Sequence, residues 1–139
     1  MRFRRLTDDE FNAVEVEFTK FLASNGLDAP EWQRIKSDNP ARVEGLLDEF
    51  STFFWEATTS RIKYLEKISE SEKWVFKFDE SSAEVIRWTY TNAGEPELMK
   101  GKKKFPEEAR GQEIFLLLEQ GLVPCPKERH EELEKLFKA

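Results

Sequence analysis

The sequence predicts an α+β fold, in which a helical N-terminal half precedes an antiparallel aromatic β-hairpin and two C-terminal helices. Two observations carry this prediction. Apolar residues recur every three to four positions between Phe11 and Ala57, which is the spacing of amphipathic helices. The spacing changes to two over residues 73–91, where aromatic and polar side chains alternate as they do in strands. A length of 139 residues suits one domain, so we expect residues 1–139 to form a single domain.

Helix-start and helix-stop residues divide the N-terminal half into three helices. The first is expected to begin near Asp8, because Thr7 begins a capping-box pattern, and to stop at Gly26. The second begins at Pro30 and the third at Pro40, since proline is favoured at the first helical position. The third helix carries the longest apolar stripe and should be buried along one side.

The remaining segments are assigned from their spacing and from turn residues. The apolar residues of Ile62–Ile68 keep the helical spacing, which predicts a further helix before the hairpin. Residues 92–105 contain asparagine, glycine and proline and read as a loop. The two C-terminal helices are expected to begin at Pro106 and Pro126.

Side-chain parity restricts the register of the hairpin. If Trp74 lies opposite Trp88, and Phe76 opposite Ile86, the large side chains gather on one face, whereas Arg87 opposite Trp74 would separate them. We therefore expect the first register, or a shift of two residues from it. Two short segments are candidates for a third strand: Arg2–Arg4 and Leu122–Val123.

Composition excludes several classes of protein. The net charge of −6 argues against a nucleic-acid binder, because phosphate-binding proteins usually present a basic face. Cys125 is the single cysteine, so no internal disulfide can form, which fits a reducing compartment. The longest apolar run, Ile114–Leu118, is too short to span a membrane, and the basic N-terminus lacks the apolar run of a signal peptide. We therefore expect a cytoplasmic protein without membrane contact.

Three segments of the N-terminal half, Arg5–Leu22, Glu31–Lys36 and Phe50–Glu66, resemble a family of short uncharacterised proteins from Bacteroidetes-type bacteria. The resemblance covers about half of the chain. It implies a bacterial cytoplasmic protein of unknown function. It implies no catalytic residues and no cofactor.

Trp55 is the first candidate for a contact surface. It points about 140° away from the centre of the apolar stripe of its helix. Its helical neighbours are polar and include Asp48, Thr52 and Thr59. Exposed aromatic side chains often anchor interfaces. The alternative is that the hairpin or the N-terminal segment covers the indole, since tryptophan is highly buried on average.

The second candidate is a basic group of five residues: Lys100, Lys102, Lys103, Lys104 and Arg110. Such a group in an acidic chain fits phosphate, RNA or an acidic partner. The alternative interpretation is a solvated segment whose charges maintain solubility, which is the commoner role of a charge run.

Catalytic and metal-binding signatures are weak. Cys125 lies near the start of the last helix, but His130, five residues further on, diverges from it by about 140° around the helix. The second histidine of a zinc-binding helix is absent, and so are a phosphate loop and a serine elbow. The sequence therefore predicts no catalytic residue, no metal and no cofactor.

The leading hypothesis is a non-enzymatic protein-interaction module with a protein partner or a homodimer. The consecutive apolar residues Ile114–Leu118 should be buried on all sides, either inside the fold or against a second subunit. One alternative is a nucleic-acid or anion binder that uses the segment Lys100–Lys104. Another is a small-molecule binder or an enzyme whose pocket no linear motif reveals.

Overall fold

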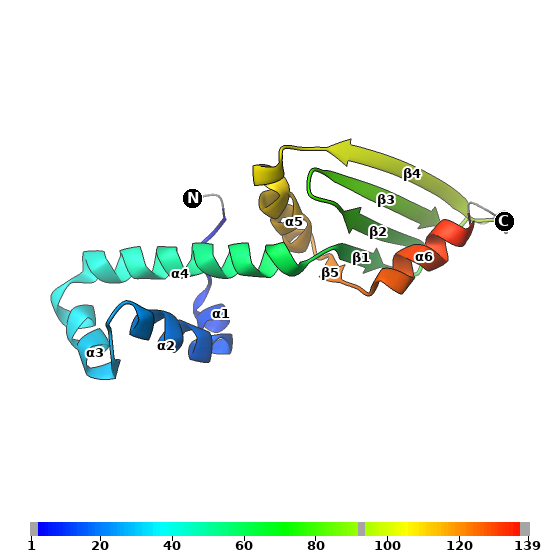
Figure 1. Ribbon diagram of the computed structural model, residues 1–139. Helices are drawn as coiled ribbons and strands as arrows, with labels where there is room; N and C mark the ends of the chain where they lie inside the picture. Colours follow the sequence, from blue (N-terminus) through cyan, green and yellow to red (C-terminus); the bar gives the residue numbers. More distant parts are fainter. Residues whose placement is uncertain (1–2, 92–93, 137–139) are drawn as a thin grey trace. The chain divides into compact units, whose positions relative to one another are not determined.

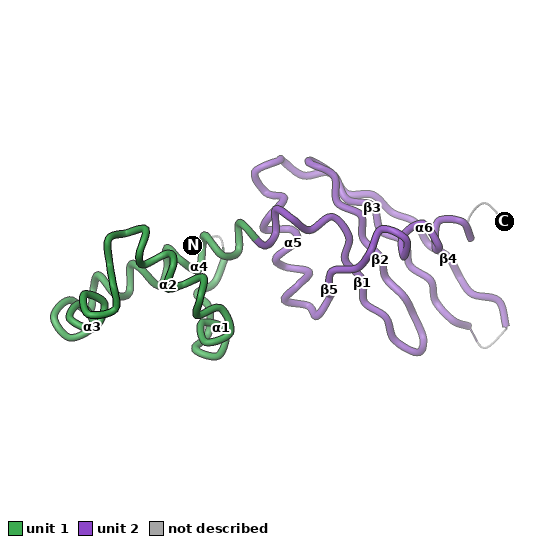
Figure 2. The backbone as a smooth tube through the Cα atoms, turned by 60° about the horizontal axis from the view of Figure 1, so that its bottom comes forward, with its two compact units in different colours: residues 1–57 green, residues 58–139 purple. Residues whose placement is uncertain are grey.

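The protein has an α+β fold, described by a computed structural model over residues 3–91 and 94–136 (Figure 1). The chain forms two compact units, residues 1–57 (unit 1) and residues 58–139 (unit 2), shown in Figure 2. The boundary lies within one long helix, α4. The predicted fold class is confirmed, and the single-domain organisation stays a prediction.

Unit 1 is helical, as the sequence predicts. Its helices are α1 (Asp8–Ala13), α2 (Glu15–Ser24), α3 (Ala29–Asp38) and most of α4 (Pro40–Arg61). The capping box is present, because the Thr7 hydroxyl accepts from the Glu10 amide at 3.2 Å and the Glu10 carboxylate accepts from the Thr7 amide at 2.8 Å. Gly26 takes a positive φ of 77° after α2. The one difference is at Val14, whose φ of −116° and ψ of 31° divide the first predicted helix in two.

Aromatic rings hold unit 1 together. Phe50 of α4 is almost fully buried, and its ring lies 6.0, 5.0 and 5.3 Å from the rings of Phe11, Phe18 and Phe21. A neighbouring aliphatic cluster consists of Leu22, Leu27, Ile35 and Leu46. The helices α1, α2 and α3 therefore pack against α4 through the apolar stripe that the sequence indicates.

Unit 2 contains a five-stranded antiparallel sheet with the order β4-β3-β2-β1-β5. Its strands are β1 (Tyr64–Ile68), β2 (Glu72–Phe78), β3 (Ser82–Thr89), β4 (Glu97–Lys104) and β5 (Val123–Pro124). The predicted hairpin corresponds to β2 and β3. The candidate strand at Leu122–Val123 corresponds to β5, shifted by one residue. At Arg2–Arg4, Phe3 and Arg4 lie outside any strand, and Arg2 lies outside the described residues.

Two segments differ from the prediction because strand pairing overrides local sequence. The helix expected over Ile62–Ile68 is wrong, since Tyr64–Ile68 pairs with β2 along its whole length. A spacing of three fits a helix. In the sheet, however, Leu65 lies opposite Phe76 and Ile68 opposite Lys73, so the two side chains lie on opposite faces. The loop expected over residues 92–105 is wrong for Glu97–Lys104, which pairs with β3 at every position. Such long-range pairing is a tertiary effect that local composition does not show.

The predicted register of the hairpin is also wrong. Trp74 lies opposite Arg87, and Val75 lies opposite Ile86. The prediction places all large side chains on one face, but both faces of this sheet are covered, so the apolar side chains are divided between them. We call the face that carries Trp74 face A and the face that carries Ile86 face B.

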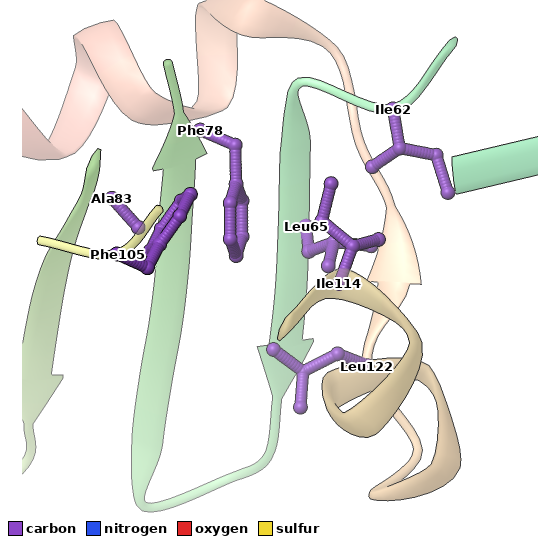
Figure 3. Close-up of a cluster of buried hydrophobic side chains, with 7 residues drawn as sticks. All are labelled: Ile62, Leu65, Phe78, Ala83, Phe105, Ile114 and Leu122. Carbon is purple, nitrogen blue, oxygen red and sulfur yellow. The ribbon is translucent and has the colours of Figure 1, made fainter. Parts of the chain in front are cut away.

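The two C-terminal helices, α5 (Arg110–Glu119) and α6 (Lys127–Leu136), pack on opposite faces of the sheet (Figure 1). A short 3₁₀ turn, Glu107–Ala109, precedes α5. Ile114 of α5 packs against Leu65 and Phe78 on face A (Figure 3). Leu133 of α6 packs against Val75 and Ile86 on face B. Helix α6 begins one residue after the predicted Pro126, whereas the predicted start at Pro106 corresponds to the 3₁₀ turn, and α5 itself begins at Arg110.

Helix α5 is not buried on all sides. Ile114 is fully buried, whereas Leu116, two residues further on, is 48% exposed. The all-round burial expected for Ile114–Leu118 is therefore wrong for this chain alone, because α5 lies over face A with one side directed away from the core.

Candidate functional site

Helix α5 leaves part of face A uncovered, and an apolar groove lies beside it. The groove has a volume of 520 Å³ and lies between α5 and strands β2, β3 and β4. Its floor consists of Trp74, Phe76, Phe78, Ala83, Val85 and Gly101. A smaller hollow of 260 Å³ shares Trp74, Phe76 and Leu117 and continues the groove towards Leu122. We call the two together the sheet groove.

The floor of the sheet groove is flat and aromatic. The rings of Trp74 and Phe76 stack with centroids 6.4 Å apart and planes 9° from parallel. Gly101 gives β4 no side chain at this point, and a Cβ there would lie 3.2 Å from Cγ1 of Val85. This contact is tighter than most, so a side chain at position 101 would force Val85 to shift by a few tenths of an ångström. A larger residue at position 101 would narrow the sheet groove.

The rim of the sheet groove combines apolar and charged side chains. Leu116 lines it from α5, and Met99, 45% exposed, lies on the same face at the outer strand. The Arg87 guanidinium lies 5.2 Å from the centroid of the Trp74 ring, a cation–π arrangement. Lys103 Nζ lies 2.9 Å from both carboxylate oxygens of Glu113, so this ion pair joins β4 to α5.

The N-terminal segment covers Trp55. The indole Nε1 donates a hydrogen bond to the carbonyl oxygen of Arg4 at 3.0 Å, and the Arg4 guanidinium lies 5.1 Å from the ring centroid. The Leu6 amide donates to the Ser51 hydroxyl at 3.0 Å and continues this contact along α4. Trp55 is only 7% exposed, so the structure agrees with the second interpretation of its position, that the N-terminal segment covers it. A contact surface built on an exposed Trp55 is not present in this structure.

Three other residues are predicted to form the surface around Trp55, and each has a different environment in the structure. Arg5 Nε donates to Asp48 Oδ1 at 2.7 Å, and this hydrogen bond lowers the pKa of Asp48 below its usual value. The Thr59 side chain is buried, and the Thr59 carbonyl accepts from Arg110 Nη1 at 3.3 Å. Thr52 is half-buried on α4.

The four lysines of the predicted basic group lie on the edge strand β4 and not in a loop. Lys103 pairs with Glu113, and Lys100 Nζ lies 3.4 Å from Oε1 of Glu134. Lys102 and Lys104 are exposed, and neither has a carboxylate partner within the described part of the chain. Two of the four lysines are therefore neutralised inside unit 2.

Arg110 serves a structural purpose. Its guanidinium donates to three carbonyl oxygens, those of Ile62 at 2.7 Å, Asp79 at 3.0 Å and Thr59 at 3.3 Å. The carbonyls of Thr59 and Ile62 lie at the C-terminal end of α4, where helical carbonyls lack partners within the helix. An open, polar hollow of 780 Å³ lies beside the guanidinium. The contacts with these carbonyls use three of the five N–H donors of the guanidinium.

Cys125 is half-buried and His130 is buried. Burial raises the pKa of the Cys125 thiol to about 11, and the nearby Glu66 carboxylate adds to this effect. The thiol is therefore protonated near neutral pH and is a poor nucleophile. His130 lies on α6 and is buried, with Nδ1 3.6 Å from Oε2 of Glu134. Among residues 3–91 and 94–136, no group of three or more His, Cys, Asp or Glu side chains is placed to hold a metal ion.

The burial of His130 predicts that unit 2 loses stability on mild acidification. Nε2 of His130 has no hydrogen-bond partner among the described residues, and burial lowers the pKa of His130 below its ordinary value of about 6.5. The charged groups that act on it are Glu134, Lys77, Glu84 and Lys100. Between the lowered pKa and 6.5, the unfolded chain binds more protons than the folded chain, so the folded state is destabilised as the pH falls through this range.

The measurement is urea unfolding between pH 7.5 and pH 5, where most carboxylates stay ionised. The free energy of unfolding should fall by at most about 1.4 kcal/mol per pH unit below pH 6.5, the limit for one proton. The variant His130→Leu should have a flatter pH profile, because His130 is the single histidine of the chain. Equal pH profiles for the two proteins would show that the burial of His130 is not the cause.

Comparison with known proteins gives a family and no function. Residues 1–95 match a family of unknown function, DUF6495. The chain belongs to this family. The DUF6495 match covers unit 1 and the strands β1, β2 and β3, whereas β4 and α5, which complete the sheet groove, follow the matched residues. Neither the curated proteins nor the solved structures contain a match to the chain.

The resemblance to a family of unknown function that the sequence indicates is thus confirmed. No helix within residues 3–91 and 94–136 has both the length and the apolar character that a membrane crossing requires.

Sequence reasoning assigns Trp74 and Phe76 to the core and does not identify the sheet groove. The groove depends on β4, which composition assigns to a loop. Leu98–Lys104 gives no local signal of a strand, because two adjacent apolar residues and three consecutive lysines interrupt any alternation.

Proposed function

We propose that the chain is a non-enzymatic protein-interaction module and that the sheet groove receives an apolar segment of a partner protein. The observation that carries the proposal is the uncovered aromatic floor between α5 and β4. The centres of protein interfaces are enriched in aromatic residues, methionine and arginine. Trp74, Phe76, Met99 and Arg87 supply these residue types on one face of the sheet. A bacterial, cytoplasmic setting, implied by the resemblance, is part of this proposal.

The chemistry of the sheet groove favours a protein segment over a small polar substrate. Small-molecule sites usually combine an apolar lining with a few convergent polar groups that orient the ligand. In the sheet groove, the two charged groups that face each other, Lys103 and Glu113, neutralise each other. The high pKa of Cys125 and the buried position of His130 give no support to an enzymatic alternative.

The test uses one exposed residue in the sheet groove and one outside it. The full chain is immobilised, and proteins from an extract of the source cells are captured on the wild type and on Leu116→Glu. Each captured protein is then purified, and its Kd is measured for the wild type, for Leu116→Glu and for the control variant Val16→Glu. Leu116→Glu should weaken binding by at least about tenfold, because a charge would be buried against an apolar segment.

The matched control is Val16→Glu. Val16 is 63% exposed on α2 in unit 1 and does not line the sheet groove, so the change adds the same charge at a residue outside the proposed site. The Kd of this variant should stay within about twofold of the wild type, since surface substitutions outside a contact have small effects. The proposal is wrong if no purified protein binds the wild type, or if Leu116→Glu and Val16→Glu bind equally well.

A further inference from the structure

Within the described residues, no strand of the sheet pairs with the outer side of β4. β4 has one neighbouring strand, β3, which pairs with all eight of its residues. The outer edge of such a strand presents backbone N–H and C=O groups that can pair with a further strand. Peptides bind many domains in this way, with main-chain hydrogen bonds for affinity and alternate side chains for specificity.

The side chains of β4 differ between the two faces. Lys100 lies opposite Ile86, so Lys100, Lys102 and Lys104 lie on face B at every second position. Met99 and Gly101 lie on face A, next to the sheet groove. Three lysines therefore lie on face B of this edge, whereas on face A Met99 and Gly101 lie beside Lys103, whose charge is paired with Glu113.

The charge of β4 is opposite to that of the chain. The strand contains four lysines and one glutamate, whereas the chain has a net charge of −6. Lys102 and Lys104 are the two lysines without a carboxylate partner in the described part of the chain. Unpaired cations at alternate positions of an edge strand complement carboxylates at alternate positions of an added strand.

We infer that β4 is the docking edge for an extended acidic segment of the partner, which adds to the sheet as a sixth strand. This inference rests on the proposed function and names the chemistry of the bound segment. Two carboxylates, two positions apart in the segment, lie opposite Lys102 and Lys104 on face B. The intervening apolar side chains lie on face A, beside Met99 and Gly101, and extend the floor of the sheet groove.

A second copy of the chain is a poor occupant of this edge. Pairing of two β4 strands would bring their lysine-rich segments together, and like charges directly opposite each other destabilise a sheet. Lysines on an edge strand also discourage aggregation. Protection against aggregation requires no ligand. It is therefore one of the outcomes that the experiment below distinguishes.

The probe is a capped eight-residue peptide of alternating valine and glutamate, which matches the length of β4. It is added to the full chain labelled with ¹⁵N, and amide shifts and amide exchange are recorded. We expect shifts and slowed exchange in β4. We expect binding to weaken by about tenfold in Lys102→Glu/Lys104→Glu, because attraction becomes repulsion at two positions. A peptide with every backbone nitrogen methylated should not bind, because it cannot form the main-chain hydrogen bonds.

The matched control is Lys20→Glu/Arg42→Glu. Both residues are exposed in unit 1, and the change in net charge is the same. This variant should bind the peptide within about twofold of the wild type, since neither residue lies on β4 and exposed charges are screened by salt. Equal weakening in the two double variants would show a nonspecific charge effect and would overturn the inference.

Other outcomes also test whether β4 is a docking edge and whether the partner enters the sheet groove. If the alternating peptide does not bind, or if the methylated peptide binds equally well, strand addition is wrong and the lysines only protect the edge. If a thymidine oligonucleotide shifts the β4 amides at a lower concentration than the peptide does, the ligand is a nucleic acid and the inference is wrong. If the peptide binds as expected but Leu116→Glu does not weaken partner binding, the groove proposal fails while the docking edge stands.

Discussion

Replacement of Ile114 by alanine is expected to lower the free energy of unfolding of unit 2 by about 3 kcal/mol, within the usual range for a large-to-small change in a core. Ile114 is fully buried among Leu65, Phe78, Phe105 and Leu122, and these neighbours come from strands and loops that are far apart in the sequence (Figure 3). Truncation leaves a cavity that rigid strands cannot fill. Urea unfolding followed by circular dichroism measures the loss.

The control is Leu116→Ala on the same helix. Leu116 is 48% exposed, so its truncation should cost less than about 1 kcal/mol. The same variant should weaken partner binding, because Leu116 lines the sheet groove. Equal losses of stability in Ile114→Ala and Leu116→Ala would contradict the position of α5 on face A.

Replacement of Arg110 by methionine is expected to lower the free energy of unfolding by about 2 to 4 kcal/mol. The methionine keeps most of the length of the side chain but removes the donors to the carbonyls of Thr59, Ile62 and Asp79. The guanidinium charge is also favourable at the C-terminal end of α4, where the helix dipole is negative. Thermal and urea unfolding measure the loss.

Two further variants separate the hydrogen bonds of Arg110 from its charge. Arg110→Lys keeps the charge but lacks the planar fork of donors, so it should recover less than half of the lost stability. Arg61→Met removes an exposed charge from the last turn of α4, and this loss should cost less than about 1 kcal/mol of unfolding free energy. The account is contradicted if Arg110→Met is no more destabilising than Arg61→Met.

The helices were the predictable part of the fold because their signals are local. Thr7, Gly26, Pro30 and Pro40 mark starts and stops within a few residues of the backbone groups that they cap. The strands β1 and β4 were not predictable in the same way. Their conformation depends on pairing with β2 and β3, which compensates for glycine and a run of lysines in β4.

The register of the hairpin could not be derived from parity alone. The aromatic residues suggest one covered face, but α5 and α6 cover face A and face B of the same sheet. Trp74 and Trp88 therefore lie on opposite faces. Once two helices cover both faces, gathering all large side chains on one face no longer gives the better register.

The candidate site was only partly predictable. The sequence identifies the lysines of β4 but not the sheet edge on which they lie. It identifies Trp55 as unusual, but the contact of its indole with the Arg4 carbonyl joins residues far apart in the sequence. The sheet groove exists because α5 leaves part of face A uncovered, which depends on the position of a helix that only the folded chain shows.

Hydrogen exchange of the full chain, with and without the purified partner, tests the central claim most directly. We predict slower exchange in Glu97–Lys104 and in Arg110–Glu119, the two elements that border the sheet groove, and unchanged exchange in α1, α2 and α3. Protection confined to residues 1–57, with none in β4 or α5, would contradict the assignment of partner binding to the sheet groove.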